Sequence, residues 1–113
     1  MHDTNEYCII LTTCPSQEEA NTMAASLIQK HLAACVQITG ITSFYEWNNT
    51  LNNDNELLLL IKSKTSHYES IEAFIRKNHS YEVPEIVQIP IMKGSSAYLG
   101  WINGCCRKQP IKE

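Results

Sequence analysis

The sequence lacks an excess of basic residues, long apolar runs, and any abundance of glycine or proline. Its 113 residues carry a net charge of −3, with four glycines and four prolines. Nucleic-acid binders usually have a basic stripe and membrane-surface segments are basic and amphipathic, so we expect neither partner. The longest apolar run, Leu57–Ile61, is too short to span a bilayer. The N-terminal residues have no cationic start followed by an apolar stretch, so we expect a cytoplasmic protein.

The five cysteines lack the C-x-x-C spacing that is typical of redox and zinc motifs. In a reducing compartment we expect them to be free thiols and not a disulfide framework. Apolar residues make up 43 % of the chain, and its length suits one domain covering residues 1–113. We expect the core of that domain at about residues 7–107, with polar tails on either side.

Hydrophobic periodicity predicts four strands and three helices. The strands are expected at residues 7–13, 32–47, 50–62 and 86–92, and the helices at residues 16–31, 66–78 and 97–105. Ser16 and Ser66 each stand three residues before a glutamate. In this capping-box pattern the serine hydroxyl and the glutamate carboxylate each accept a hydrogen bond from a backbone N–H at the helix start. We therefore expect a capping box at the first and second helices.

Three places in the strands predict local features. Gly40 stands where the alternation of apolar and polar residues changes phase, which indicates a β-bulge. Asn48-Asn49 predicts a two-residue primed turn, because asparagine tolerates positive φ. Pro90 has no backbone N–H to donate, so we expect it at an edge of the sheet.

The predicted order of elements, β-α-β-β-α-β and a last helix, is typical of the α+β ferredoxin-like sandwich. A strand rises about 3.3 Å per residue and a helix about 1.5 Å, so the central hairpin is longer than the helices that cover it. Its tip carries Phe44, Tyr45 and Trp47. Large exposed aromatic patches are uncommon on monomers, so we expect a homo-oligomer in which hairpin edges pair. The alternative is a hairpin that curls back over its own sheet.

The chain carries several motifs in a fixed order: LAACV at 32–36, ITSFY at 41–45, Trp47, Glu56, Lys62, HSYEVPE at 79–85 and YLGW at 98–101. Together these motifs resemble the CutA divalent-cation tolerance family, from about Tyr7 to Arg107. The resemblance implies a single CutA-like domain that forms a homotrimer by intersubunit strand pairing, similar to the arrangement of PII signalling proteins. It also implies a link to copper and other divalent cations, metal binding in some members, and no established catalytic activity.

His79 and Cys14 are the candidate metal ligands, for copper or another divalent cation. Imidazole is a common ligand of copper and zinc, and a thiolate favours copper(I). Members of the resembled family with a proposed copper site have a cysteine where this chain has Thr12, and two histidines before a proline where it has Asn78-His79-Ser80. If the first and fourth strands are antiparallel, we expect Cys14 and His79 at opposite ends, meeting only across a subunit boundary. Alternatively, His79 hydrogen-bonds a helix end.

A second group of residues is expected to line a cleft. Lys62, Tyr81 and Glu85 can converge there, and Trp47 and Glu56 belong to the hairpin that meets the neighbouring subunit. Ionisable groups that converge and perturb one another's pKa values are typical of functional sites. This arrangement predicts a pocket for a small anionic ligand at a subunit interface. The alternative is a buried, salt-bridged interface that fixes the register of the subunits.

Three functions follow from these sites, the third being an enzyme that uses Tyr81, Glu85 and Lys62. The first is a homotrimeric CutA-like protein of copper tolerance that binds metal, and the second is a PII-like trimeric sensor or scaffold for a small anionic ligand. We expect a binding protein and not an enzyme, because the sequence has no G-x-S-x-G, phosphate-loop or H-E-x-x-H motif. No catalytic residue is assigned, since a Cys14 nucleophile would need a base that the sequence does not indicate.

Overall fold

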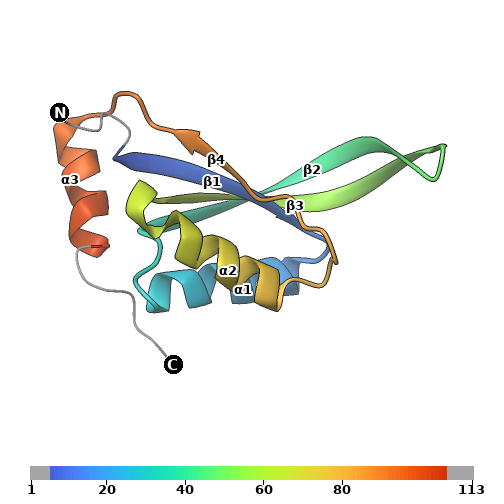
Figure 1. Ribbon diagram of the computed structural model, residues 1–113, viewed down its shortest axis with the longest axis horizontal. Helices are drawn as coiled ribbons and strands as arrows, with labels where there is room; N and C mark the ends of the chain where they lie inside the picture. Colours follow the sequence, from blue (N-terminus) through green and yellow to red (C-terminus); the bar gives the residue numbers. More distant parts are fainter. Residues whose placement is uncertain (1–5, 107–113) are drawn as a thin grey trace.

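The computed structural model describes residues 6–106, which form a four-stranded antiparallel sheet and three α-helices (Figure 1). The strands are β1 (Tyr7–Cys14), β2 (Cys35–Trp47), β3 (Thr50–Lys64) and β4 (Val87–Pro90). The helices are α1 (Gln17–Gln29), α2 (Tyr68–Asn78) and α3 (Ser96–Cys105), and a 3-10 turn at Thr65–His67 precedes α2. The predicted tails and the boundary at Arg107 lie outside the described residues. Within residues 6–106 no helix is both long and apolar enough to cross a membrane.

The order of strands in the sheet is β2-β3-β1-β4. β1 lies in the middle, where Ile10 pairs with Ile61 of β3 and Leu11 pairs with Val87 of β4, both antiparallel. Helix α1 connects β1 to β2, and α2 connects β3 to β4. In both cases the two connected strands are not adjacent in the sheet, which gives the split βαβ topology. The predicted α+β ferredoxin-like order of elements is confirmed.

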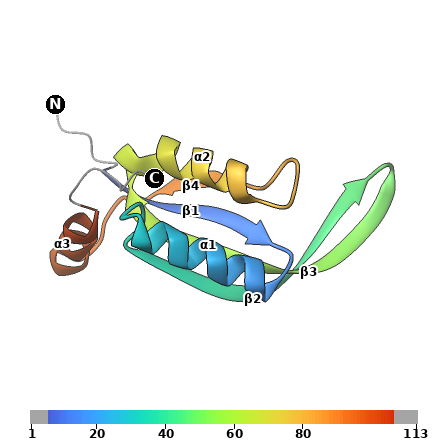
Figure 2. The same cartoon turned by 90° about the horizontal axis from the view of Figure 1, so that it is seen from below.

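The helices α1 and α2 cover one face of the sheet, and α3 packs at one end of it (Figure 2). The main core lies between the sheet and these two helices. It is built from fully buried alternate residues of the strands and one stripe of each helix: Cys8, Ile10, Cys14, Leu59, Ile61, Ala20, Met23, Leu27, Ile71 and Ile75. The period of two in the strands and of about 3.6 in the helices brings these side chains to a common layer.

The opposite face of the sheet has no helix over it (Figure 1). Ile9 pairs with Ile89, and Leu11 pairs with both Leu60 and Val87, so these side chains share that face. Val87 and Ile89 keep 45 % and 46 % of their surface exposed. A half-covered apolar sheet face of this kind is usually an interaction surface. We call the side chains Ile9, Leu11, Leu60, Val87 and Ile89 the bare face.

The hairpin of β2 and β3 extends beyond the rest of the sheet (Figure 1). β1 ends opposite Leu57, so residues 50–56 of β3 pair with β2 alone. Asn48 and Asn49 have φ of 54° and 61°, which confirms the predicted primed turn. The predicted bulge at Gly40 is wrong, because the register runs without interruption through Gly40 opposite Leu57. The sequence changes phase there because beyond Gly40 the strand no longer has one covered face.

The helix starts differ from one another. Ser16 caps α1 as predicted, since its hydroxyl accepts a hydrogen bond of 3.2 Å from the Glu19 N–H. The capping box predicted at Ser66 is wrong, because Ser66 lies in the 3-10 turn and α2 begins after His67 with no side-chain cap. Pro90 lies in the edge strand β4, as predicted.

Candidate functional site

Cys14 is the last residue of β1 and lies on the helix-covered side of the sheet. The sequence placed it past the strand end, but it pairs with Leu57 and is fully buried. Burial in the core, together with the nearby carboxylates of Glu19 and Glu56, raises the pKa of the Cys14 thiol to about 11. The thiol is therefore protonated at neutral pH. The five cysteines of the chain, all within the described residues, are free.

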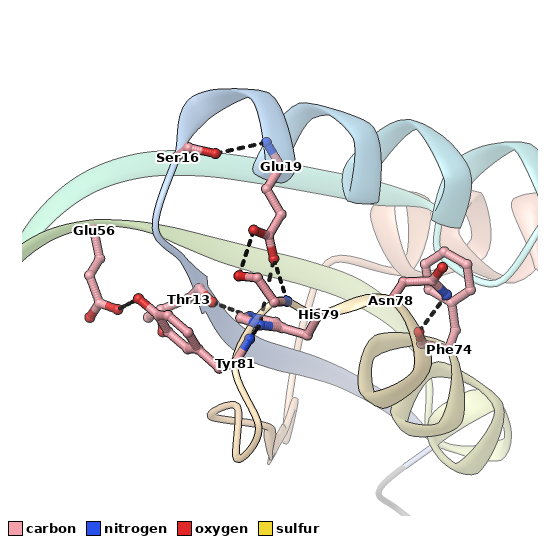
Figure 3. A network of polar contacts seen from close by, with 9 residues as sticks. Thr13, Ser16, Glu19, Glu56, Phe74, Asn78, His79 and Tyr81 are labelled. Atoms are coloured by element: carbon pink, nitrogen blue, oxygen red, sulfur yellow. Dashed lines mark hydrogen bonds and ion pairs between the residues drawn. The ribbon is translucent and has the colours of Figure 1, made fainter.

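Glu19 stands in the first turn of α1, directly above the end of β1 (Figure 3). The capping-box pattern predicts that its carboxylate turns back to the N–H of Ser16. That half of the prediction is wrong, because the carboxylate accepts hydrogen bonds from Ser80 instead: 3.1 Å from the backbone N–H and 2.8 Å from the hydroxyl. Glu19 therefore ties the start of α1 to the segment that follows α2.

His79 is the C-cap of α2, with extended backbone angles, and its side chain is fully buried. Its Nδ1 accepts a hydrogen bond of 2.9 Å from the Tyr81 N–H and lies 3.5 Å from a Glu19 carboxylate oxygen. Because a backbone N–H can only donate, Nδ1 is unprotonated and Nε2 carries the hydrogen. Nε2–H then donates to the Thr13 carbonyl at 2.6 Å. A carbonyl that holds one ring N–H in this way is the usual support of a metal-binding histidine.

The thiol of Cys14, the carboxylate of Glu19 and the imidazole of His79 come together within one chain. Their ligand atoms all lie within 4.8 Å of one another, and among residues 6–106 this is the group of three that suits a metal ion. The expectation that Cys14 and His79 lie at opposite ends is wrong. In an antiparallel pair the start of one strand lies beside the end of the other, so the segment before β4 reaches the end of β1.

Thr12 adds an unusual feature beside this group. Its Oγ1 is fully buried and has no hydrogen-bond partner among the described residues. Side chains alternate along a strand, so Thr12 shares with Cys14 the helix-covered side of β1. A buried hydroxyl without a partner is rare, because its desolvation is unfavourable, and an ion or water beside it is one explanation. The donor set of Cys14, Glu19 and His79 fits a bound cation.

Tyr81 connects the same segment to the hairpin. Its hydroxyl donates a hydrogen bond of 2.9 Å to Glu56 of β3, and its ring lies 4.8 Å from the His79 ring, centre to centre. Burial, together with the bond to Glu56, raises the pKa of the Tyr81 phenol. A second tyrosine, Tyr45, donates to Asp54 farther along the hairpin. The prediction grouped Tyr81 with Glu56, and the structure places them in direct contact.

Lys62, Glu85 and Trp47 lie away from this contact. Lys62 is six residues from Glu56 along β3, about 20 Å at the rise of a strand. Its ammonium lies 5.6 Å from the centre of the Tyr98 ring on α3. Glu85 is exposed in the segment before β4, and Trp47 is 67 % exposed at the hairpin tip. Within one chain, therefore, the structure does not bring Lys62 to Tyr81.

The sequence analysis missed Glu19 and Ser80 as site residues. Glu19 was assigned to a helix cap, which is what its spacing from Ser16 indicates locally. The two residues are 61 positions apart and meet only because β4 lies antiparallel to β1. The signal that finds them is topological: the residues after β1 and before β4 share one end of the sheet.

The fold and the site together define an α+β protein of ferredoxin-like topology with a buried thiol, imidazole and carboxylate at one end of its sheet. The chain belongs to the CutA1 divalent ion tolerance protein family, which matches residues 8–105.

Individual relatives agree with this assignment. The chain is 43 % identical over 96 residues to the divalent-cation tolerance protein CutA of Thermus thermophilus, covering 84 % of this chain and 93 % of that protein. It is 40 % identical over 100 residues to the chloroplastic protein CutA of Arabidopsis thaliana, of which it spans only 55 %. Among solved structures, CutA1 of Shewanella sp. SIB1 superposes with a TM-score of 0.88 at 38 % identity, covering 91 % of this chain and 97 % of that one. CutA1 of Oryza sativa gives 0.88 at 35 % identity, covering 94 % and 99 %.

Proposed function

We propose that this chain acts in tolerance of divalent cations by binding a metal ion, copper or zinc, through Cys14, Glu19 and His79. One observation carries the proposal: the three ligand atoms lie within 4.8 Å of one another at a buried position. Family membership supports the general role. The metal, its site and its link to copper are the proposed part.

The chemistry of the three ligands favours soft or borderline ions. Thiolate and imidazole suit copper(I) and zinc, whereas magnesium and calcium prefer sites made only of oxygen. At metal–ligand distances of about 2.0–2.3 Å, neighbouring ligand atoms of a tetrahedral site lie about 3.5 Å apart. The Glu19 and His79 ligand atoms, 3.5 Å apart, already have this spacing, so any closing, by at most about 1 Å, is between this pair and the Cys14 sulfur. Glu19 lies in a helix and His79 in a loop segment, so the loop is the part that moves.

Binding also requires the proton of Cys14 to leave. A metal ion coordinates the thiolate, and a thiol with a pKa of about 11 gives up its proton only in exchange for the ion. Metal affinity therefore rises with pH through the neutral range. The Nε2–H of His79 stays on the Thr13 carbonyl and keeps the ring oriented.

The proposal includes assembly as a homotrimer. The bare face and the protruding hairpin leave apolar surface on two sides of the subunit, where second copies of this chain would pack. Phe44 and Trp47 at the tip are each 67 % exposed and Leu51 is 74 % exposed. Residues 50–56 of β3 reach about 20 Å past β1, far enough to lie along a neighbouring subunit.

Titration with copper(I) under reducing conditions, in competition with a colorimetric chelator, tests the metal site. We expect one equivalent per chain in the wild type and no uptake above background in His79→Ala or Cys14→Ala. The matched control is His31→Asn, which removes an exposed histidine at a positive φ that asparagine accepts. Equal uptake by the wild type and His79→Ala contradicts the proposal.

A further inference from the structure

Tyr81 makes two hydrogen bonds, one through its backbone to the proposed metal ligand His79 and one through its side chain to the hairpin (Figure 3). Its backbone N–H donates to His79 Nδ1 at 2.9 Å, and its hydroxyl donates to Glu56 at 2.9 Å. The ring itself lies against the His79 ring, 4.8 Å between centres. Any change at His79 therefore reaches Glu56 through a single residue.

A metal ion and the Tyr81 N–H compete for the same lone pair. A neutral imidazole has one N–H and one unprotonated nitrogen. If the ion binds Nδ1, it takes the lone pair that now accepts the Tyr81 N–H. If it binds Nε2, the hydrogen moves to Nδ1 and the lone pair is lost as well. Coordination through either nitrogen leaves the Tyr81 N–H without its acceptor.

The contact between Tyr81 and Glu56 has little tolerance for the movement that follows. The N–H needs a new partner, which water supplies if the segment turns outward, and its neighbours Ser80 and Glu82 are already exposed. That turn moves Tyr81 as a whole, and any movement of His79 toward the Cys14 sulfur displaces the Tyr81 ring packed against it. A hydrogen bond weakens steeply over such a shift in distance and angle.

We infer that occupation of the Cys14–Glu19–His79 site by a metal ion and the Tyr81–Glu56 bond oppose each other, so that metal loading releases the base of the hairpin. The inference rests on the proposed metal site. Glu56 is the first residue of β3 beyond the edge of β1, in the part that pairs with β2 alone. Metal binding removes the Tyr81 hydroxyl from the Glu56 carboxylate. That carboxylate then lies without its hydrogen-bond donor near Asp54, which is two residues away on the same face of β3. The metal site thereby regulates the surface that the hairpin offers to a second copy.

Thermodynamic linkage provides a quantitative test. If metal binding weakens the Tyr81–Glu56 bond, that bond must lower the metal affinity by the same free energy. Zinc affinity is measured by competition with a chromophoric chelator in the presence of a thiol-free reductant. We expect Tyr81→Phe, which keeps the backbone N–H and removes the phenol bond, to bind zinc about tenfold more tightly, the equivalent of one hydrogen bond to a charged group. Tyr45→Phe is the matched control, since it removes a phenol bond to Asp54 of the same hairpin and leaves the Tyr81–His79 and Tyr81–Glu56 bonds in place. Glu56→Gln keeps a neutral acceptor and should give a smaller gain; it replaces Tyr81→Phe if that variant does not fold.

Hydrogen exchange provides a second readout. In the wild type, zinc should speed the hydrogen exchange of the amides of residues 54–57 and 80–82. In the Tyr81→Phe variant, zinc should leave the exchange of residues 54–57 unchanged. Equal zinc affinities in the wild type, Tyr81→Phe and Tyr45→Phe overturn the inference alone. Equal tightening in both tyrosine variants also overturns it, because that effect belongs to the hairpin in general. A wild type that binds copper(I) but not zinc is compared with the same variants by copper(I) titration, and absence of binding of both metals overturns the metal site together with this inference.

Discussion

Two thiols of β1 keep their protons to an unusually high pH. Burial raises the pKa of Cys8 from 9.0 to about 11, although a bond to Thr65 lowers it in part, and burial with two nearby carboxylates does the same for Cys14. Between pH 9.0 and about 11 the unfolded chain loses these protons and the folded chain keeps them. The folded state therefore binds more protons, and stability falls as pH rises through this window.

Each thiol should contribute about 2 kcal/mol to the free energy of unfolding below this window, and that contribution is lost as the pH rises through it. Urea denaturation at pH 8 and at pH 10.5 measures it. The Cys14→Ala variant should show a smaller drop than the wild type, and a variant lacking both Cys8 and Cys14 a smaller one still. A drop of the same size in all three proteins would show that other groups control the alkaline stability.

At the scale of single residues, the sequence predicted part of the site from chemistry alone. Cys14 and His79 stand out because thiols and imidazoles are the usual soft ligands. Glu19 does not stand out, because its spacing from Ser16 already has a local explanation. Its true partner, Ser80, is 61 positions away. Local sequence patterns therefore identify candidate ligands, and the pairing of β1 with β4 determines which of them lie together.

Among the elements, the hairpin turn depends on two asparagines with positive φ. Left-handed backbone is unfavourable for residues with a Cβ, least so for asparagine, and glycine adopts it freely. We expect Asn49→Ala to lower the free energy of unfolding by about 1 kcal/mol, and Asn49→Gly to leave it unchanged or to raise it by a few tenths.

Chemical denaturation at fixed protein concentration measures both variants, since the proposed assembly would make stability depend on concentration. The control is Asn53→Ala, an exposed asparagine of β3 that is not among the residues with positive φ. If Asn49→Ala and Asn53→Ala have the same effect, the turn conformation is not what Asn49 contributes.

The elements themselves were predictable where one face is covered throughout. α1 and α2 follow the helical periodicity because the main core covers one side of each, whereas β1 and β3 were predicted from their continuous apolar runs. The error at Gly40 occurs where β2 leaves that cover, so that the pattern of apolar residues no longer reports a single buried side. The error at Ser66 has another cause, because a 3-10 turn occupies the residues at which the helix was expected to begin.

For the whole molecule, the bare face predicts the assembly. We expect sedimentation equilibrium to give about three times the 12.9 kDa mass of one chain. Val87→Lys places a charge on that face at a half-exposed edge position, so it should dissociate the assembly without disturbing the main core. Gln29→Lys, at the exposed end of α1 on the other side of the sheet, is the control and should leave the mass unchanged.

A single species of 12.9 kDa at micromolar concentration would contradict this arrangement, and so would an unchanged mass for Val87→Lys. The sequence pointed to self-association because the hairpin exceeds the length of its helices. It gave no indication of the bare face, since the residues of β1 read as a continuous apolar strand whichever side is covered.

The unequal exposure of the three ligand groups has a consequence for how cations arrive. The Glu19 side chain is 20 % exposed, whereas the His79 side chain and Cys14 are fully buried. At the proposed site a cation from solution would therefore meet the Glu19 oxygen before the two buried ligands. Magnesium sheds its water reluctantly and stops at the carboxylate, while a thiophilic ion gains from every inward step. The proposed site would thus discriminate against hard cations at its exposed carboxylate, before they contact the buried thiol and imidazole.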